Sequence, residues 1–528
     1  MSNHAYESAA ALRPSSNGPI PISTLCERFS LAPASAEDAA ALNDLSILGV
    51  SVDSADTAPG ELFVGLPGFT VHGARFAAQA VASGAVAVLT DADGAQIVHQ
   101  TAPGTPVLVH SDPRAVVGPL SAEVYHHPAR GLVTTAVTGT NGKTTTAYFL
   151  DAILSAHVGG CMVAGTVELR VGERSVESPR TTVEAPVLQR MMALAVEDKV
   201  GAASLEASSH AIVLHRLDGI VVDVAGFTNL QRDHLDFHKT MEGYLEAKAQ
   251  LFTPEHARRG VVCVDDQWGA TLAAEAPIEI DRVRAYPGDT PADWWVSDAA
   301  VSLTDSATTF TLHGPDGEKI EASCPLPGLV NVQNAALALV MAIRAGVPAA
   351  TAATALAGAH NIPGRMQRIS QRDGRRGLCI VDFAHTPDAM ELALKAVRPI
   401  TPGRLIVVFG SDGDRDQGKR PMLGEVCARL ADVLVVTDEN PRSEDPQLIR
   451  NAILEGVRGV RPDLTDVEEI TTWRGDAVRR GVELCGPDDT VIVTGKGHEP
   501  FLEMAGEFIR YNDAPVMAEA VEEKWGRA

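Results

Sequence analysis

Cysteine is scarce and scattered in this sequence. The seven cysteines, an odd number, stand at positions 26, 161, 263, 324, 379, 427 and 485, and no two of them form a C-x-x-C pair. This spacing excludes the disulfide frameworks of small secreted proteins and the usual structural zinc sites. Long apolar runs are also missing, because no stretch approaches the roughly 18–20 apolar residues that a membrane span needs. We therefore expect a soluble, cytoplasmic protein without membrane insertion.

Positive charge is in short supply as well. The 528 residues include 44 Lys and Arg against 68 Asp and Glu, which gives a formal net charge of −24. Such an acidic chain is not a generic binder of nucleic acids or anionic membranes. Aromatic residues make up only 5% of the chain, but its 45% hydrophobic content is enough to bury substantial cores.

The chain divides into three blocks in which apolar runs alternate with helical stretches. Residues 1–130 predict a small α/β domain that follows about 20 disordered residues. Residues 131–362 and 363–528 repeat the alternation, which predicts mostly parallel sheets covered by helices. We expect a hinge at Asn361–Met366, because Pro363 and Gly364 both interrupt regular structure. The predicted fold is therefore α/β with three domains.

Strand ends in the third block indicate a binding site. Four apolar runs there end in polar or glycine residues: LCIVDFAH, RLIVVFGSDGD, ADVLVVTDEN and DTVIVTGKGHE. The carboxyl ends of parallel strands are where ligands gather in open α/β sheets. After the first run, Thr386 is a good N-cap and Pro387 a good first helical residue.

A glycine-rich loop follows the apolar run Leu132–Val137 and precedes a helical stretch. Its residues are Thr138, Gly139, Thr140, Asn141, Gly142, Lys143, Thr144 and Thr145. In such a loop, backbone amides surround phosphate oxygens, the lysine pairs with the terminal phosphates and a hydroxyl binds Mg²⁺. Val137 stands where the usual motif begins with glycine, yet the flanking strand and helix favour nucleotide binding over a plain turn. Because no Asn-Lys-x-Asp guanine-reading motif occurs, ATP is favoured over GTP.

Three other features are ambiguous on their own. Glu206 ends the run AASLE and suits Mg²⁺, although an isolated acid is more often a cap or a surface charge. The loop Thr228–His238 holds five ionisable side chains and is equally typical of a solvated turn. Lys248 lies in the helical stretch Tyr244–Phe252, where a single lysine is most simply a surface residue.

Taken together, these segments resemble the Mur ligases of peptidoglycan synthesis, and most closely the members that add 2,6-diaminopimelate. The matching motifs are TGTNGKTTT, LEASSHAIVLHR, FTNLQRDHLDFHKTMEGYLEAKAQLF, GLVNVQNAALA, IPGRMQRI, VDFAHTPDAM, GSDGDRDQGKRPMLG, TDENPRSEDP and VTGKGHE. The resemblance implies an N-terminal UDP-substrate domain (1–130), a central P-loop ATPase-type domain (131–362) and a C-terminal Rossmann-like domain for the amino acid (363–528). It also implies an ATP-dependent ligase. ATP phosphorylates the D-Glu carboxylate of UDP-N-acetylmuramoyl-L-Ala-D-Glu, and an amine of meso-2,6-diaminopimelate attacks the acyl phosphate.

The resemblance implies roles for individual residues. Thr144 and Glu206 are expected to hold one Mg²⁺, and His234 with a CO₂-carbamylated Lys248 a second one. Lys143, Glu206, His234 and Lys248 form the expected catalytic set. Further ATP contacts are expected from Gly139, Thr140, Asn141, Gly142, Thr145, Asn331, Arg365, Asp382 and His385. The expected contacts of the UDP substrate are Ser54, Phe69, Thr70, Val71, Thr181, Thr182, Ser208 and Arg216.

The choice of amino acid is predicted from the Asn-Pro-Arg motif. Diaminopimelate carries a second carboxylate at its far end, and the forked guanidinium of Arg442 suits it. In the family this motif accompanies diaminopimelate. The expected contacts are Arg415, Glu439, Asn440, Pro441, Arg442, Gly495 and Glu499. Glu439 stands where Asp is common, a change that we expect to matter little.

The sequence departs from the family at three further places. Ala55 replaces an expected arginine near the UDP end, and Arg180, where asparagine is frequent, offers a compensating charge. The segment Arg510–Asp513 is also unusual, and its role is open. The alternatives are a lysine-adding ligase of the same family, a folylpolyglutamate-synthase-like ligase, or an inactive nucleotide-binding scaffold. We expect a monomer.

Overall fold

The computed structural model describes residues 9–302, 307–359 and 362–526. Asn361 of the expected hinge and the first eight residues therefore lie outside the described part. The chain forms two compact units: one holds Met1–Arg284, Gly288–Trp294 and Leu337–Ala355, and the other Ala285–Pro287, Trp295–Ala336 and Leu356–Ala528. Each unit is described by itself. The expected domain boundaries near residues 130 and 362 stay a prediction.

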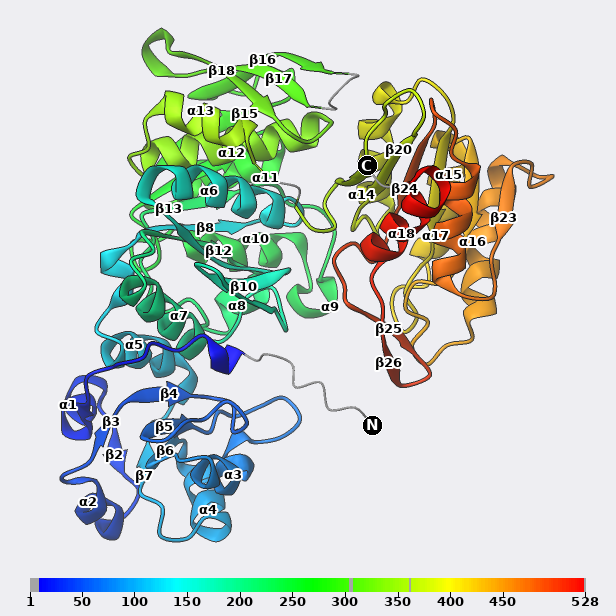
Figure 1. Cartoon of the computed structure of the whole chain (residues 1–528). Helices are drawn as coiled ribbons and strands as arrows, with labels where there is room; N and C mark the ends of the chain where they lie inside the picture. The colour runs from blue at the N-terminus through cyan, green and yellow to red at the C-terminus, as the bar shows by residue number, and fades with distance from the viewer. Residues whose placement is uncertain (1–8, 303–306, 360–361, 527–528) are drawn as a thin grey trace. The chain divides into compact units, whose positions relative to one another are not determined.

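The first unit begins with a five-stranded sheet. Its order is β2 (Ala32–Pro33), β7 (Val107–Val109), β6 (Ala87–Thr90), β5 (Glu61–Val64) and β4 (Gly49–Ser51), all parallel except β2. Leu62 and Val64 face a core that includes α1 (Ile22–Phe29) and α5 (Pro113–Val124). Phe63 faces the opposite core with α3 (Ala77–Ala82) and α4 (Ala92–Thr101), so helices cover both faces (Figure 1).

Residues 9–20 correct one expectation from the sequence, because they are ordered. Ala9–Ala11 form a 3₁₀ turn, and the side chain of Leu12 is fully buried in the core around α7 (Ala185–Glu197). Arg190 of α7 donates to the Ala9 backbone oxygen (2.7 Å) and to Asp56 Oδ2 (2.9 Å). The polar composition of this segment concealed these long-range contacts.

The phosphate loop belongs to a second, larger sheet of the first unit. Eight strands follow the order β11 (Arg174–Glu177), β10 (Glu168–Val171), β9 (Cys161–Ala164), β12 (Ala202–Glu206), β8 (Val133–Thr138), β13 (Val224–Phe227), β14 (Arg259–Cys263) and β15 (Glu279–Arg284). The six strands β9, β12, β8, β13, β14 and β15 run parallel to one another. β10 pairs antiparallel with β9 and with β11. In Figure 1, α6 (Lys143–Val158) and α7 lie on opposite faces of this sheet. The central strand β8 therefore delivers the loop to the carboxyl edge of the parallel strands.

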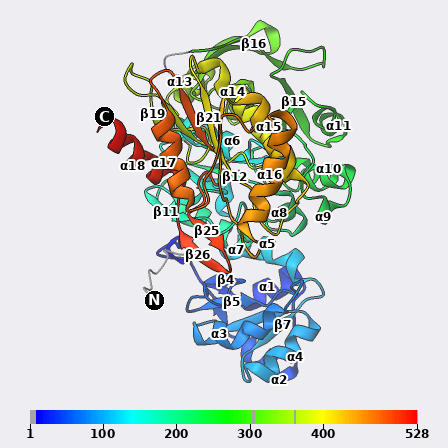
Figure 2. The ribbon, with the colours of Figure 1, turned by 90° about the vertical axis from the view of Figure 1, so that its right-hand side faces the viewer.

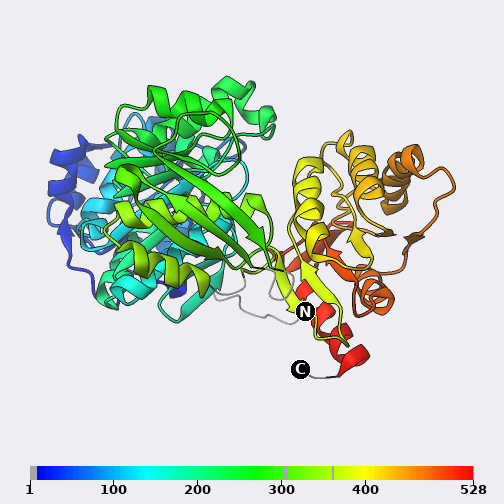
Figure 3. The ribbon, with the colours of Figure 1, turned by 90° about the horizontal axis from the view of Figure 1, so that it is seen from above.

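The second unit contains a six-stranded sheet of Rossmann type. Its order is β19 (Gln367–Ser370), β20 (Leu378–Val381), β24 (Thr490–Val493), β21 (Leu405–Phe409), β22 (Val433–Val436) and β23 (Val467–Glu469), with only β19 antiparallel. In Figure 2, α17 (Arg474–Leu484) and α18 (Asp513–Trp525) lie on one side, and α14 (Pro387–Val397), α15 (Lys419–Leu430) and α16 (Pro446–Val460) on the other. Figure 3 shows the same layers from above. Thr386 caps α14 and Pro387 is its first residue, as predicted.

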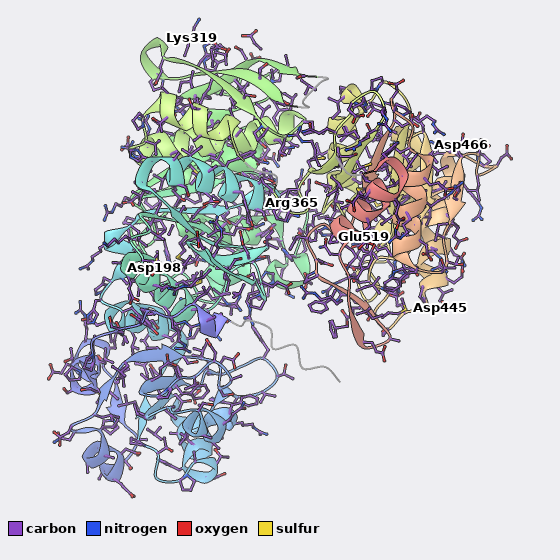
Figure 4. All side chains as sticks on the ribbon, viewed as in Figure 1. Asp198, Lys319, Arg365, Asp445, Asp466 and Glu519 are labelled. Carbon is purple, nitrogen blue, oxygen red and sulfur yellow. The ribbon has the colours of Figure 1, made fainter. Side chains whose placement is uncertain are left out.

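The second unit also holds an antiparallel extension of three strands, which is not part of the six-stranded sheet. β16 (Trp294–Val301), β17 (Thr308–His313) and β18 (Lys319–Cys324) pair in chain order. The parallel sheets, with the helices that cover them, confirm the predicted α/β class. Charged residues such as Asp198, Lys319, Asp466 and Glu519 are exposed on the outside of their units (Figure 4). Among the described helices, none combines the length and apolar character that a membrane span requires.

Candidate active site

The phosphate loop requires glycine at two positions. Gly139 has φ 142°, and Gly142, which immediately precedes α6, has φ 90°. A Cβ on residue 139 would lie 1.9 Å from Thr228 Oγ1, so the loop also depends on a close approach to the end of β13. Other residues rarely adopt these conformations. The loop ends at the N-terminus of a 16-residue helix, where the backbone amides of the first turn and the helix dipole favour a phosphate.

The segment after β13 holds this loop in place. The Thr140 amide donates to the Asn229 backbone oxygen (2.9 Å), and the Asn141 amide donates to Asn229 Oδ1 (3.1 Å). Lys143 Nζ donates to the backbone oxygens of Gly139 and Thr140, at 2.9 Å each. The lysine is thus folded back over the loop, with its ammonium beside the peptide groups that would cradle a phosphate.

Glu206 ends β12 and is only 1% exposed. Its Oε2 accepts hydrogen bonds from Thr144 Oγ1 (3.0 Å) and Thr166 Oγ1 (2.9 Å), and its Oε1 accepts one from the Thr166 amide (2.8 Å). A buried carboxylate beside a hydroxyl offers the hard oxygen ligands that Mg²⁺ prefers. In the described part of the chain, no three His, Cys, Asp or Glu side chains form a group that could hold a metal. A Mg²⁺ held by Thr144 and Glu206 would therefore take its other ligands from phosphates and water.

Lys248 is not a surface lysine, although its sequence context alone favours that interpretation. It lies in α10 (Met241–Ala249), is 1% exposed, and its Nζ donates to the Gly139 backbone oxygen (2.8 Å) and to Thr138 Oγ1 (3.4 Å). The ammonium is also 4.6 Å from the centre of the Tyr244 ring. Burial, with a smaller contribution from the Lys143 charge, lowers the pKa of Lys248 well below its ordinary value.

His234 stands at the start of the short helix α9 (Leu235–His238) with a left-handed backbone, φ 53°. Its ring lies 4.9 Å from that of His210, centre to centre, in an edge-on arrangement. Burial lowers the pKa of His234, and the charges of Lys143 and Lys248 lower it further against the opposing effect of Asp233. A histidine kept neutral beside two lysines is suited to bind a cation through a ring nitrogen. The phosphate loop, Glu206, Lys248 and His234 thus form one group.

Residues expected to contact the UDP substrate adjoin this group. Thr182 Oγ1 donates to the Glu206 backbone oxygen (2.7 Å) and accepts from the Ser208 amide (3.0 Å). Arg216 donates to the Thr182 backbone oxygen (3.1 Å), and Thr181 Oγ1 accepts from Thr166 Oγ1 (3.2 Å). The structure therefore connects four of the eight expected residues to Glu206, through its backbone oxygen and through Thr166.

Three arginines surround Glu184. The nitrogen–oxygen distances are 3.5 Å for Arg114, 3.1 Å for Arg180 and 2.9 Å for Arg216. The cluster keeps an excess of positive charge, which suits an anionic substrate. Arg180, whose charge was expected to offset the missing arginine at Ala55, belongs to this cluster and has a half-exposed side chain.

The other expected UDP contacts lie in the five-stranded part of the first unit. Ser54 is buried and donates to Gln79 Oε1 (3.1 Å). Phe69, Thr70 and Val71 form an exposed loop, in which Phe69 is 90% exposed. The large apolar side chain of Phe69 is therefore accessible to a ligand.

In the second unit, three expected ATP contacts gather after β20. Asp382 accepts the Met366 amide at 2.8 Å, and burial raises its pKa. The Arg365 guanidinium lies 4.4 Å over the Phe383 ring, and His385 Nδ1 lies 2.8 Å from the Phe383 backbone oxygen. The structure therefore groups Arg365, Asp382 and His385 around one strand end.

Asn331 and Arg415 are placed by other segments of that unit. Asn331, near the start of α12 (Leu329–Arg344), is buried and donates to the Pro327 backbone oxygen (2.7 Å). Arg415 is exposed in the segment between β21 and α15. Their expected ligand contacts stay predictions.

Arg442 is oriented by an unusual backbone. It has φ 55°, its amide donates to the Glu503 backbone oxygen (3.0 Å), and its own backbone oxygen accepts from the Ala505 amide (2.7 Å). The guanidinium lies 3.8 Å from Asp412 and 3.7 Å from Glu503, near the outer limit of ion pairing. The protein's own carboxylates thus hold Arg442 only loosely, which suits a residue that is to bind a substrate carboxylate.

Glu439 lies against Gly495 in the same region. It is 3% exposed, and a Cβ on residue 495, where φ is 108°, would lie 2.5 Å from Glu439 Oε2. Burial and the nearby charge of Asp412 raise the pKa of Glu439 to about 8. The raised pKa favours the neutral acid, which can donate a hydrogen bond.

The comparisons with known proteins cover almost all of the chain. Models described as the Mur ligase family catalytic domain, the Mur ligase middle domain and the Mur ligase glutamate ligase domain match residues 46–125, 137–342 and 364–497. A protein of Streptomyces avermitilis named UDP-N-acetylmuramoyl-L-alanyl-D-glutamate–2,6-diaminopimelate ligase is 43% identical over 483 residues, which cover 92% of this chain and 94% of that protein. The chain belongs to the Mur ligase family.

Other members of the Mur ligase family agree with this assignment. A UDP-N-acetylmuramyl-tripeptide synthetase of Leifsonia xyli subsp. xyli is 42% identical over 508 residues, covering 95% of this chain and 96% of that one. A solved structure of a UDP-N-acetylmuramoyl-L-alanyl-D-glutamate–2,6-diaminopimelate ligase has a TM-score of 0.63 and 31% identity, covering 90% of this chain and 95% of that chain.

Two residues of this Mur ligase were given no role from the sequence. Thr166 follows β9 and donates twice to Glu206, and no motif marks it. Lys496 lies within the quoted run VTGKGHE and is fully buried. The position of Lys496 between two glycines at a strand end could have indicated a role, but only the structure shows its hydrogen-bond partners.

Proposed function

We propose that this Mur ligase joins 2,6-diaminopimelate to the D-Glu carboxylate of UDP-N-acetylmuramoyl-L-Ala-D-Glu at the expense of ATP, as a step of peptidoglycan synthesis. The observation that carries this function is the 43% identity to a ligase with that name over nearly the full length of both chains. The grouping of Lys143, Glu206, His234 and Lys248 supports it, because these four residues form the catalytic set expected from the sequence.

The substrate carboxylate and the γ-phosphate of ATP repel each other, and the residues of the site reduce this repulsion. Lys143 supplies a cation at the phosphate loop, and the amides at the start of α6 bind phosphate oxygens without adding a competing charge. The arginines around Glu184 orient the anionic peptide end. Mg²⁺, when bound by Thr144 and Glu206, neutralises phosphate charge. The amine of diaminopimelate then displaces phosphate from the activated carboxyl.

Lys248 acts in this proposal as a carbamate. Its lowered pKa favours the neutral amine, the form that can attack CO₂ and release a proton. The product carries a negative charge, which the nearby Lys143 stabilises, and it offers oxygens to a second Mg²⁺ together with His234. Intact-protein mass spectrometry of Lys248→Met and wild type prepared under CO₂ tests this step. A mass increase of one CO₂ in the wild type alone is the expected result, and equal masses after correction for the substitution would contradict it.

The remaining roles are proposed as they were predicted. Asn331, Arg365, Asp382 and His385 contact ATP, and Ser54, Phe69–Val71, Thr181, Thr182, Ser208 and Arg216 contact the UDP substrate. Arg415, Glu439–Arg442, Gly495 and Glu499 contact the amino acid. We also propose domain boundaries near residues 130 and 362, and a cytoplasmic, monomeric enzyme.

Phosphate release tests the proposed function against its alternatives. Purified protein is given ATP, Mg²⁺ and UDP-N-acetylmuramoyl-L-Ala-D-Glu, with diaminopimelate, lysine or no amino acid. We expect release that depends on diaminopimelate. Faster release with lysine would instead indicate the lysine-adding ligase. A further reaction contains a folate and glutamate in place of the UDP substrate and the amino acid, and release there alone would indicate the folylpolyglutamate-synthase-like enzyme. No release in any of these reactions would indicate the inactive scaffold.

A further inference from the structure

Lys496 is a buried lysine with three protein acceptors. Its side chain is inaccessible to solvent, and Nζ donates to Asn440 Oδ1 (2.8 Å), to Glu499 Oε2 (3.0 Å) and to the Phe501 backbone oxygen. Placing an ammonium in such a site is unfavourable unless every proton is paired. The three acceptors come from the segments after β22 and β24 and from β25 (Phe501–Met504).

These contacts determine the orientation of the Asn440 amide. Its Oδ1 accepts from Lys496 and from the Glu503 amide (3.1 Å), and its Nδ2 donates to Glu499 Oε2 (3.0 Å). A flipped amide would place an NH₂ group against an ammonium and a backbone amide. Asn440 and Glu499, both expected to contact the amino acid, are therefore held in one arrangement by Lys496.

A second buried cation, Arg474, joins the segments that follow β22 and β24. Arg474, also inaccessible, donates to the backbone oxygens of Asp438 (2.9 Å) and Thr494 (2.8 Å), which lie just before Glu439 and Gly495. Its guanidinium is fixed by both carboxylate oxygens of Asp513, at 2.9 and 2.8 Å.

The segment at residues 511–513, whose role the sequence left open, completes this support. Tyr511 Oη donates to Asp513 Oδ1 (2.9 Å), and Asn512 Nδ2 donates to the Glu499 backbone oxygen (3.1 Å). The start of α18 is thus tied both to Arg474 and to the segment that carries Glu499.

We propose that Lys496 is a positioning residue for the amino-acid substrate, and that Arg474 with Asp513 supports it by fastening the two substrate-binding segments together. This inference rests on the proposed function, because it assigns the residues around Asn440 and Glu499 to diaminopimelate. Lys496 itself is fully occupied by the protein and sets the direction of the groups that touch the substrate.

The test compares Lys496→Met with Lys524→Met in the full-length enzyme. Lys524 is a matched control: in the same unit, it donates to the backbone oxygens of Val482, Glu483 and Cys485 at the end of α17. The KM for diaminopimelate, the KM for ATP and the thermal unfolding midpoint are measured for each variant. We expect Lys496→Met to raise the KM for diaminopimelate about tenfold or more, as the loss of a charge-assisted hydrogen bond does, and to leave the KM for ATP within about twofold.

The control separates positioning from general destabilisation. Lys524→Met is expected to lower the unfolding midpoint without changing the ratio of the two KM values. Lys496→Gln, which retains an uncharged NH₂ donor, is measured alongside and decides the matter if the Met variant does not fold. A wild-type KM ratio in the folded Lys496 variants would overturn the proposal. Wild-type enzyme that shows no diaminopimelate-dependent phosphate release would instead overturn the proposed function.

Discussion

At the scale of single residues, burial decides which titratable groups have unusual chemistry. Lys248 is ordinary in sequence, yet burial, with the nearby charge of Lys143, lowers the pKa of its amine well below the ordinary value. Glu439 substitutes for an expected Asp, and burial against Gly495 raises its pKa to about 8. Sequence motifs identified both positions. The motifs do not predict either pKa shift, because each shift is caused by burial among residues that are distant in sequence.

The carboxylate of Glu206 is predicted to determine the response to Mg²⁺. Glu206→Gln keeps the shape of the side chain but loses the charge and one acceptor, so it should lower kcat by about 100-fold and raise the Mg²⁺ concentration needed for half-maximal rate. The measurement is phosphate release during a Mg²⁺ titration. The control is Glu168→Gln in β10, which alters a carboxylate that accepts a hydrogen bond from Tyr148. It should leave the Mg²⁺ midpoint unchanged. Equal midpoints for all three proteins would contradict the metal assignment.

His238 is predicted to make stability depend on acid. Burial, with the charges of His210, Lys248 and His234, lowers its pKa from 6.5 to about 4. Below pH 6.5 His238 binds a proton in the unfolded chain but not yet in the folded protein. The free energy of unfolding should therefore fall between pH 6.5 and 4. Urea unfolding of wild type and His238→Gln across this range measures the effect. The variant should lose less stability on acidification, and parallel curves would show that His238 does not contribute.

At the scale of secondary-structure elements, local signals predicted most of the framework. Apolar runs marked β8 and the strands of the second unit, and Thr386 with Pro387 marked the start of α14. The antiparallel extension formed by β16, β17 and β18 was not predicted. Its strands lack continuous apolar runs, because one of their faces is largely exposed.

The candidate site was predictable to the extent that its motifs are contiguous. The phosphate loop and the helix carrying Lys248 were recognised, but the contact of Asn229 with the loop depends on the pairing of β8 with β13. Thr166 approaches Glu206 through the neighbouring strand β9. Such contacts follow from strand order, which a single sequence does not contain.

The loop between β8 and α6 is predicted to tolerate no side chain at residue 139. Gly139→Ala places a methyl group against Thr228 and forces an unfavourable backbone, which should cost about 1–3 kcal/mol and abolish ATP binding. The matched control is Gly159→Ala at the end of the same helix, where φ is 83° and no atom lies within 4 Å of the added Cβ. Calorimetric titration with ATP should show binding by the control only. ATP binding by both variants would contradict the loop geometry.

At the scale of the whole chain, the N-terminal segment is predicted to stabilise the first unit. Leu12 is fully buried against the core around α7, so Leu12→Ala should lower the free energy of unfolding by about 2–4 kcal/mol. Leu48→Ala, at a residue that is 43% exposed, is the control and should cost less than about 1 kcal/mol. Equal losses in urea unfolding would show that the segment is not held as described.

The central claim is that a chain with a net charge of −24 brings a carboxylate and the γ-phosphate of ATP together and joins the activated carboxyl to an amine. Mass spectrometry of the UDP-linked product, formed from UDP-N-acetylmuramoyl-L-Ala-D-Glu and ATP with diaminopimelate and lysine present together, tests this most directly. The account predicts a product heavier by one diaminopimelate residue, with one ADP and one phosphate formed for each bond. A product that carries lysine, or ATP hydrolysis without any heavier product, would contradict it.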